Sequence, residues 1–390
     1  MNEILVVLFW GSVALVIYAT LGWPLALALR ALVPTGTPRT TDELPTVSYL
    51  IVAHNERDEV DAKLANTAAL DYPADRFEVI FASDGSDDGT DERVAELWRR
   101  DPRNCLLSLP RVGKNAALNA AAAAASGQIL VFSDADSHLA PDAIRRLVAP
   151  LTDPSIGAAG GDFRYAGEGG EGERTYWSFD RLWKRLACRA GNMTSATGQI
   201  YAIRAALFEP APDGVTDDFF VSTGAIAAGT RLWFAEDAVA TGRVASSSRA
   251  ELRRKVRVTA RGLSSVWARR ALLDPRRSGF YALQLFTHKV CRRLLGAPVA
   301  LAFLCSIALA PVDPIYAGAA MIQALVHGAA LAGWILRDRV HSRGLALPFY
   351  LDLVLAAGVL AIIDVARGRQ HLVWEPERGA EPAAAAFGGR

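Results

Sequence analysis

Long, mostly apolar stretches occupy both ends of the sequence and predict membrane helices. Residues 4–29 contain no charged side chain and, as a helix, are long enough to cross the roughly 30 Å hydrocarbon core of a bilayer with a tilt. Residues 294–310, 315–336 and 345–366 are similarly apolar, although the first of these runs is short for a full span. A cleaved signal peptide fits residues 4–29 poorly, because that run is too long and lacks a basic start. We therefore expect four spans.

Arginines beside these runs predict on which side of the membrane the central part of the chain lies. Arg30 and Arg39 follow the first run, so the positive-inside rule places the next domain in the cytosol. Four spans would then put the carboxyl terminus outside, yet Arg367 and Arg369 follow the last run. The side of the carboxyl terminus stays open, and the Ala- and Gly-rich tail from Gly379 is expected to be disordered.

Between these ends, short apolar runs of strand length alternate with helical stretches. Strands are predicted at residues 46–53, 78–83, 105–109 and 128–133. Helices are predicted at residues 57–70, 89–100, 114–126 and 141–151. This alternation predicts an α/β domain whose mostly parallel sheet is covered on both faces. Ligands of such sheets bind at the carboxyl ends of the strands, so the residues just after each strand are the candidates for chemistry.

Composition and charge narrow the class of protein. Of the 390 residues, 51 % are hydrophobic, which excludes a disordered chain, and the net charge of +1 argues against a strongly basic nucleic-acid binder. Residues 243–293 depart from this balance, because they contain fourteen Lys and Arg but only two acids. Mixed with apolar residues, these charges predict amphipathic helices on an anionic membrane leaflet rather than a nucleic-acid surface. Four scattered cysteines are interpreted as reduced and structural.

Acidic residues follow three of the four predicted strands, as His54-Asn55-Glu56, as residues 84–90 and as Asp134-Ala135-Asp136. Residues two apart in an extended chain point to the same side, so Asp134 and Asp136 can face one cation. Carboxylate oxygens at an open edge suit Mg²⁺ or Mn²⁺. An Asp-x-Asp by itself is more often a polar turn, but the two neighbouring acidic strand ends favour a metal. Lys114, at the start of a predicted Ala-rich helix, either meets an anion or is simply solvated.

The order of these motifs resembles that of family-2 glycosyltransferases, which have the GT-A fold. Some members of that family also have membrane helices, among them the hyaluronan, chitin-oligosaccharide and poly-N-acetylglucosamine synthases and ceramide glucosyltransferase. Residues 84–90 match the family's Asp-Gly-Ser-x-Asp-x-Thr, residues 113–119 resemble its Gly-Lys-x-x-Ala-Leu-Asn, and residues 134–136 match its metal motif. The resemblance implies that Asp136 binds Mg²⁺ or Mn²⁺ and that Asp134 holds the ribose or helps at the metal. It also implies a donor site formed by Ala53, Asn55, Glu56, Asp84, Ser86 and Lys114.

The second half of the domain resembles the part of the family that supplies the acceptor site and the base. Thr216 to Phe219 resembles the Thr-Glu-Asp motif, which implies that Asp218 is the catalytic base and that Asp217 stands at the Glu position. A base is needed because a sugar hydroxyl is a poor nucleophile until its proton is removed. The adjacent aspartates are alternatively a helix cap, and the two roles could coexist. By the same resemblance, residues 195–204 provide acceptor contacts through Thr197, Gly198, Tyr201 and Arg204.

A basic stretch falls where the family's synthases carry Gln-x-x-Arg-Trp. The charge that develops on a leaving nucleoside diphosphate needs cations, and the resemblance implies that Arg254, Arg257 and Arg261 supply them on the donor side. Arg257 aligns with the Arg of the motif, whereas Arg254 replaces Gln and Val258 replaces Trp. Because that Trp belongs to the acceptor end of processive synthases, its absence favours the addition of one or a few sugars.

Together these expectations describe an inverting, metal-dependent, membrane-embedded glycosyltransferase. Its donor is expected to be a cytosolic, UDP-linked sugar and its acceptor a hydroxyl of a lipid or lipid-linked glycan, with membrane lipids and no nucleic acid as partners. The alternatives are a processive polysaccharide synthase that exports its product and a catalytically silent binding or scaffold protein. The expected domains are a membrane helix (1–30), a cytosolic GT-A domain (45–262), amphipathic interfacial helices (263–293), membrane helices (294–366) and a tail (367–390).

Overall fold

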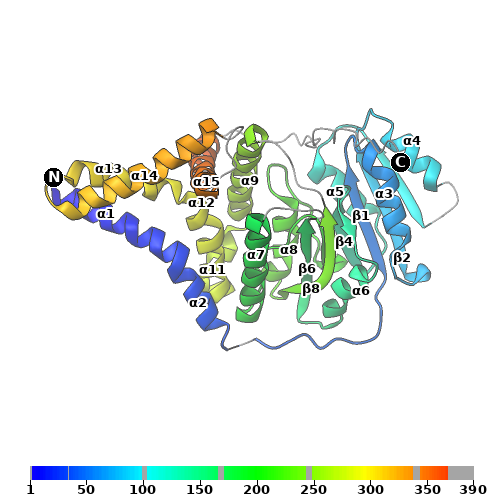
Figure 1. Ribbon diagram of the computed structural model, residues 1–390. Coiled ribbons are helices and arrows are strands. Elements are labelled where there is room, and N and C mark those ends of the chain that lie inside the picture. Colours follow the sequence, from blue (N-terminus) through cyan, green and yellow to red (C-terminus); the bar gives the residue numbers. More distant parts are fainter. Residues whose placement is uncertain are drawn as a thin grey trace, which may run out of the picture. The chain divides into compact units, whose positions relative to one another are not determined.

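The computed structural model describes residues 2–33, 35–98, 103–165, 171–242, 248–336 and 343–367 (Figure 1). Their contacts divide them into two compact units. An α/β unit contains residue 35 to Glu251, and a helical unit contains the residues up to Val33 and from Leu252 onward. The predicted catalytic motifs up to Asp218 therefore all belong to the α/β unit.

A mixed sheet forms the centre of the α/β unit, and its eight described strands follow the order β3-β2-β1-β4-β7-β6-β8-β5. The strands are β1 (Val47–Ala53), β2 (Phe77–Asp84), β3 (Asn104–Leu109), β4 (Ile129–Asp134), β5 (His138–Leu139), β6 (Ile156–Tyr165), β7 (Tyr201–Arg204) and β8 (Arg231–Gly242). Parallel pairs join β3, β2, β1 and β4 and join β6 to β8, whereas β7 is antiparallel to β4 and β6, and β5 is antiparallel to β8. The α/β class and the mostly parallel pairing are confirmed, and the first four predicted strands match within one residue at each end.

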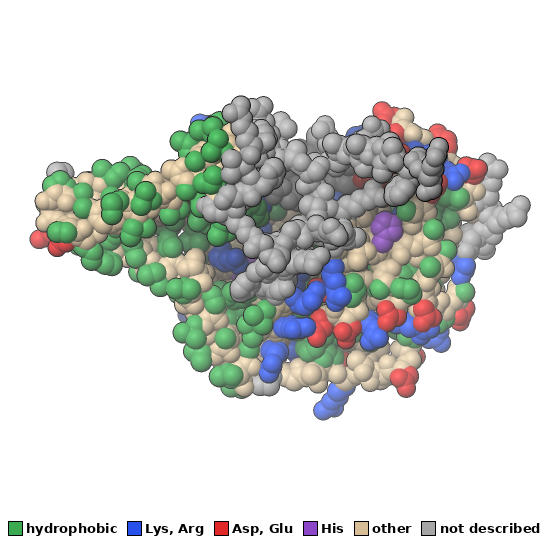
Figure 2. Space-filling model, viewed as in Figure 1, with side chains coloured by type: hydrophobic (Ala, Val, Ile, Leu, Met, Phe, Trp, Pro, Cys, Tyr) green, Lys and Arg blue, Asp and Glu red, His purple; other side chains and the backbone are tan. Residues whose placement is uncertain are grey.

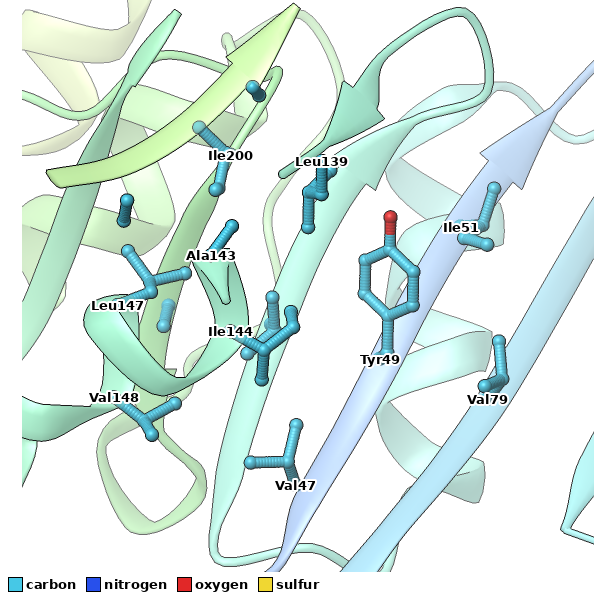
Figure 3. Close-up of a cluster of buried hydrophobic side chains, with 14 of the residues drawn as sticks. Val47, Tyr49, Ile51, Val79, Leu139, Ala143, Ile144, Leu147, Val148 and Ile200 are labelled. Carbon is cyan, nitrogen blue, oxygen red and sulfur yellow. The ribbon is translucent and has the colours of Figure 1, made fainter. Parts of the chain in front are cut away.

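Helices on the two faces of the sheet bury the alternating side chains of its central strands. All seven residues of β1 are buried, with Tyr49 and Ile51 in one core and Leu50 and Val52 in the other. The first core, drawn in Figure 3, includes side chains of α3 (Arg57–Ala68) and α6 (Ala143–Val148). The second includes side chains of α5 (Lys114–Ala124) and α8 (Asp217–Ala227). Since burying one large apolar side chain contributes about 1.5–3 kcal/mol, these cores hold the strand ends in fixed positions.

The helical unit contains the apolar runs that were predicted to span a membrane. Among the described residues, three segments are long and apolar enough to do so: Asn2–Arg30, Pro314–Leu336 and Leu347–Val365. The run predicted at 294–310 forms α13 (Gly296–Leu309), which is bent by 52° from the preceding Phe280–Leu294 and adds a fourth span only together with it. Apolar side chains cover much of the surface of α1 (Asn2–Ile17), α13 and α14 (Pro314–Leu336) in Figure 2. This surface is suited to lipid.

The expected domain boundaries at 262, 293 and 366 stay predictions. Helix α9 (Ser248–Ala268) continues through residue 262, and short helical segments follow it as far as Leu294. Helix α15 (Arg343–Ala366) ends close to the predicted limit of the last apolar run. The predicted disordered tail, with Arg369, lies outside the described residues.

Candidate active site

The carboxyl ends of β1, β2 and β4 meet at one edge of the sheet. In the parallel register, Ala53 at the end of β1 is level with Ser83 of β2, and Val52 is level with Asp134 of β4. The acidic residues that follow these strands are therefore neighbours, as their positions in the sequence predicted. Ala53 itself is fully buried, so its contribution to a donor site is limited to the backbone and the shape of the edge.

The loops after β1 and β2 are joined by a set of hydrogen bonds. The backbone N–H of Asn55 donates to Ser86 Oγ (3.0 Å), and its side-chain amide exchanges hydrogen bonds with Asp87 Oδ1 (2.8 Å) and the Asp87 N–H (2.9 Å). The N–H of Glu56 donates to Thr90 Oγ1 (3.0 Å). Asn55 has φ of +55°, a conformation that asparagine adopts more readily than most residues. Asn55 and Ser86 thus shape this end of the edge.

The carboxylate of Asp84 fixes the loop that leads from β3 to α5. Its side chain is fully buried and forms an ion pair with Arg111, while the N–H groups of Val112 (2.7 Å) and Gly113 (2.9 Å) donate to Oδ1. Gly85, with φ of +63°, lies so close to this loop that a Cβ there would be 2.6 Å from the Arg111 nitrogen. Three groups of the chain thus bind this carboxylate and hold the loop, and the donor-site role of Asp84 stays a prediction.

Lys114 joins the predicted metal motif to the predicted acid pair. As the first residue of α5, it places Nζ 2.8 Å from Asp134 Oδ1 and 3.5 Å from Asp217 Oδ2, and its side chain is only 14 % exposed. Burial would lower the pKa of this ammonium group, but the charges of Asp134, Asp217 and Asp218 outweigh burial and hold the pKa well above its usual range. Lys114 is therefore a permanent cation between two carboxylates that are 83 residues apart in the chain.

The carboxyl groups of Glu56 and Asp136 lie near that of Asp134, and their surroundings raise the pKa of both groups. Burial raises the pKa of Glu56 to about 8, and the charges of Asp136 and Asp134 add to the effect. Burial, together with the charge of Asp134, also raises the pKa of Asp136. Among the described residues, no three His, Cys, Asp or Glu side chains are grouped as a complete metal site. The side chains of Asp134 and Asp136 offer carboxylate oxygens, which are ligands that Mg²⁺ or Mn²⁺ would accept, with water and phosphate completing the shell.

The segment before β7 lies beside this acidic group. A Cβ added to Gly198 would be 3.4 Å from Asp134 Oδ2, an ordinary van der Waals distance, so the backbone at Gly198 passes close to that carboxylate. Thr197 Oγ1 is buried and has no hydrogen-bond partner among the described residues. Tyr201 is fully buried against Phe132, with ring centroids 4.6 Å apart, and its hydroxyl donates to Asp217 Oδ2 at 3.5 Å. Gly198 is thus close to Asp134 and Tyr201 to Asp217, and Thr197 precedes Gly198 in the chain.

Arg204, the fourth predicted acceptor residue, is not brought to this edge. It pairs with Ile129 at the start of β4, about 17 Å along the strand from the metal motif. Its guanidinium donates to the carbonyl oxygens of Leu151 (2.6 Å), Asp153 (3.0 Å) and Ile156 (2.9 Å). Because the antiparallel direction of β7 carries its last residue away from the site, we remove Arg204 from the acceptor site and assign it a structural role.

The acid pair begins α8. Asp217 is buried and close to Lys114 and Tyr201, whereas Asp218 is half-buried and its Oδ1 accepts a hydrogen bond from the Phe219 N–H (2.7 Å). Acidic side chains in the first turn also stabilise the positive end of a helix. The local structural role and the predicted catalytic role of Asp218 are therefore compatible.

The structure leaves the predicted arginine cluster untested. Arg257 and Arg261 belong to the part of α9 in the helical unit, and the side chain of Arg254 lies outside the described residues. Their donor-side role stays a prediction.

Two cations that contact the site were not predicted from the sequence. Arg111 pairs with Asp84, and Lys63 of α3 is fully buried beneath the metal motif. Lys63 lies on the buried side of α3 with Val60 and Leu64. The helical periodicity predicts that this position is buried, and this was the sequence signal that could have identified Lys63. For Arg111 we find no comparable local signal.

Comparisons with known proteins show what the chain is similar to. Residues 48–210 match the model of glycosyl transferase family 2. The chain is 27 % identical over 257 residues to an N-acetylglucosaminyltransferase of Rhizobium meliloti (61 % of this chain, 58 % of that protein) and 37 % identical over 127 residues to the probable glycosyltransferase YdaM of Bacillus subtilis (31 % and 30 %). It is 31 % identical over 163 residues to a beta-monoglucosyldiacylglycerol synthase of Synechocystis (38 % and 33 %). The matches thus cover between 30 % and 58 % of the length of these relatives.

A solved structure has the same fold over nearly the whole chain. The mannosyltransferase PcManGT of Pyrobaculum calidifontis, solved with GDP-Man and Mn²⁺, gives a TM-score of 0.71 at 23 % identity and covers 93 % of this chain and 99 % of that one. The fold is therefore that of a GT-A-type glycosyltransferase with apolar helices at both ends of the chain. Within that fold, the match to glycosyl transferase family 2 covers residues 48–210, the part of the chain that holds β2, β4 and all but the first residue of β1, with the motifs at their ends.

Proposed function

We propose that this protein is a membrane-embedded, inverting glycosyltransferase. It would move a sugar from a nucleotide-sugar donor, which we expect to be UDP-linked, to a hydroxyl of a lipid or lipid-linked glycan. The observation that carries the proposal is the position of Lys114, which contacts Asp134 of the metal motif and Asp217 of the acid pair at the carboxyl edge of the sheet. These contacts support the proposal because they join the predicted metal motif to the acid pair, whose second member, Asp218, is the proposed base.

The chemistry follows from what each side chain can do at that edge. Asp218 would accept the proton of the acceptor hydroxyl as the hydroxyl oxygen bonds to the anomeric carbon, while the bond from that carbon to the diphosphate breaks. One displacement with one base and no protein nucleophile inverts the anomeric centre. Asp136, assisted by Asp134, would hold the divalent cation, which when bound supplies positive charge to the leaving diphosphate. Lys114 would keep the Asp134 and Asp217 carboxylates in place.

The apolar helices and the relatives support a membrane location and a lipid acceptor. Three described segments are suited to cross a bilayer, and the synthase from Synechocystis is named for a glucosyldiacylglycerol product. By the positive-inside rule, Arg30 and Arg39 support a cytosolic position for the α/β unit. Val258 stands where the processive synthases carry Trp, which favours one or a few additions over a long polymer.

A donor screen tests this proposal. The purified full chain, in lipid nanodiscs with Mn²⁺ or Mg²⁺, is offered a panel of nucleotide sugars together with diacylglycerol, and released nucleotide and product size are measured. We expect metal-dependent release with one donor and a product carrying one or a few sugars. Absence of release with every donor would overturn the proposed activity. A ladder of long chains would instead support the processive synthase.

A further inference from the structure

A fully buried lysine lies directly beneath the metal motif. Lys63 projects from α3, and its Nζ donates to Ser133 Oγ (2.9 Å), to the carbonyl oxygen of Asp134 (2.8 Å) and to the carbonyl oxygen of Ser137 (2.5 Å). Its ammonium group also lies 5.5 Å from the centre of the Tyr49 ring. Three oxygen acceptors match the three N–H donors of a lysine, so the ammonium group is fully hydrogen-bonded.

Two of these acceptors, the carbonyl oxygens of Asp134 and Ser137, belong to the first and last residues of one short turn. The turn from Asp134 to Ser137, which we call the metal turn, is closed by a hydrogen bond from the Ser137 N–H to the Asp134 carbonyl oxygen (3.3 Å). Lys63 bonds the carbonyl oxygens of its first and last residues and therefore fixes the length and orientation of the turn. The two carboxylates of the metal motif, at Asp134 and Asp136, project from this same turn.

A second side chain of α3 extends the contact beyond the metal turn. The Asn66 amide donates to the carbonyl oxygen of Leu139 (2.7 Å), and its Oδ1 accepts from the Leu139 N–H (2.8 Å). Asn66 thus binds β5, whereas Lys63 binds the metal turn itself. Helix α3 therefore anchors both the metal turn and β5. Of its two side chains, only Lys63 contacts the turn that carries the Asp134 and Asp136 carboxylates.

Burying a lysine costs more free energy than packing alone would require. Removing an ammonium group from water costs several kcal/mol, and an apolar side chain of similar length would fill the same space without that cost. Such a replacement would, however, leave buried oxygens without donors, at about 1–3 kcal/mol for each unsatisfied group. The charge is therefore best explained by the oxygens that it binds.

We propose that Lys63 is a positioning residue that holds the metal turn in the conformation in which Asp134 and Asp136 receive the divalent cation. This role rests on the proposed function, since it assigns the carboxylates to a metal. Side chains that orient metal ligands typically change metal affinity about 10- to 100-fold when they are removed. We expect a loss of that size when Lys63 is replaced, although Lys63 never touches the cation.

The test compares Lys63→Met with Asn66→Ala in the full chain. Mn²⁺ alone is titrated and its binding followed by electron paramagnetic resonance, and hydrogen–deuterium exchange is measured over residues 134–139. Lys63→Met should weaken Mn²⁺ binding about 10- to 100-fold and accelerate exchange in the metal turn. Asn66→Ala, the matched control, also removes hydrogen bonds to α3, but it should accelerate exchange at Leu139 and keep the parent affinity for Mn²⁺.

The outcomes separate this role from the proposed function. Parent affinity for Mn²⁺ and parent exchange in a folded Lys63→Met protein would overturn the positioning role alone. A parent protein that binds no Mn²⁺ would overturn both the metal-dependent function and this role. If Lys63→Met does not fold, Lys63→Gln, which keeps an N–H donor for part of the turn, should show a smaller loss in the same direction, and an unchanged affinity in that variant would also refute the role.

Discussion

Replacing Lys114 by methionine is the sharpest perturbation of the contact on which the proposed site depends. Methionine has a similar length but no charge, so Asp134 and Asp217 would lose the ammonium group that lies 2.8 and 3.5 Å away. The two carboxylates would then face each other at a half-buried edge. We expect both ion pairs to be lost and the metal motif and the acid pair to shift relative to each other.

The structure sets the expected size of the effect. Removing one partner of a buried ion pair costs about 3–5 kcal/mol, and the side chains of Lys114, Asp134 and Asp217 are 14 %, 25 % and 10 % exposed. Because this exposure allows some screening by water, we expect the lower end, about 3 kcal/mol. For a unit of this size about 1 kcal/mol corresponds to roughly 2–4 °C in Tm, so Lys114→Met should lower Tm by about 6–12 °C without metal.

A double-mutant cycle distinguishes the ion pair from general damage to the fold. Thermal unfolding of the α/β unit is measured in EDTA for Lys114→Met, Asp134→Asn and the double variant. The double variant should lose less stability than the sum of the single variants, with a coupling of about 0.5–3 kcal/mol. Additive losses would refute the reasoning, because they would mean that the two side chains do not interact. Lys114→Arg, which keeps the charge, is the matched control.

Three further substitutions have distinct expected results. Asp136→Asn should remove the Mn²⁺ dependence of donor binding in calorimetry, and an unchanged response to Mn²⁺ would place the cation elsewhere. Gly85→Ala should lower the free energy of unfolding by about 1 kcal/mol or more, because its φ is +63° and the new Cβ would lie 2.6 Å from the Arg111 nitrogen; a parent Tm would contradict this. Hydrogen bonds from the Arg39 N–H and the Ser155 N–H lower the pKa of Asp153 to about 2. The ionised carboxylate therefore stabilises the fold above about pH 4, and this contribution is lost as the pH falls towards 2. Asp153→Asn should flatten that part of the plot of Tm against pH, and a curve parallel to the parent's would contradict the assignment.

The sheet and its acidic edge could be predicted because both depend on local patterns. Each central strand is a short, nearly continuous apolar run, and β1 is indeed buried at all seven positions. The parallel direction of β1, β2 and β4 then brings Glu56, Asp84 and Asp134 to one edge with no further information. For Lys114 the sequence left an anion or solvent open as its partner, and the structure pairs it with the carboxylates of Asp134 and Asp217.

The parts that could not be predicted depend on contacts between distant segments. Arg204 lies in a motif that resembles the acceptor segment, but the antiparallel register of β7 carries it to the opposite edge. Asp84 is held by Arg111 and two backbone N–H groups of a loop whose path no local pattern specifies. The helical periodicity places Lys63 on the buried side of α3, but the oxygens that it binds come from residues 70 to 74 positions away, which no local pattern specifies.

The central claim is that Asp218 acts as the base for a sugar transferred from a nucleotide donor at this edge. The most direct test compares donor binding with single-turnover transfer in the parent and in Asp218→Asn, using the donor found in the screen and saturating Mn²⁺. The account predicts donor affinity close to the parent's and transfer slower by about 10²- to 10⁴-fold, the usual contribution of a general base. Transfer by Asp218→Asn at the parent rate would contradict it.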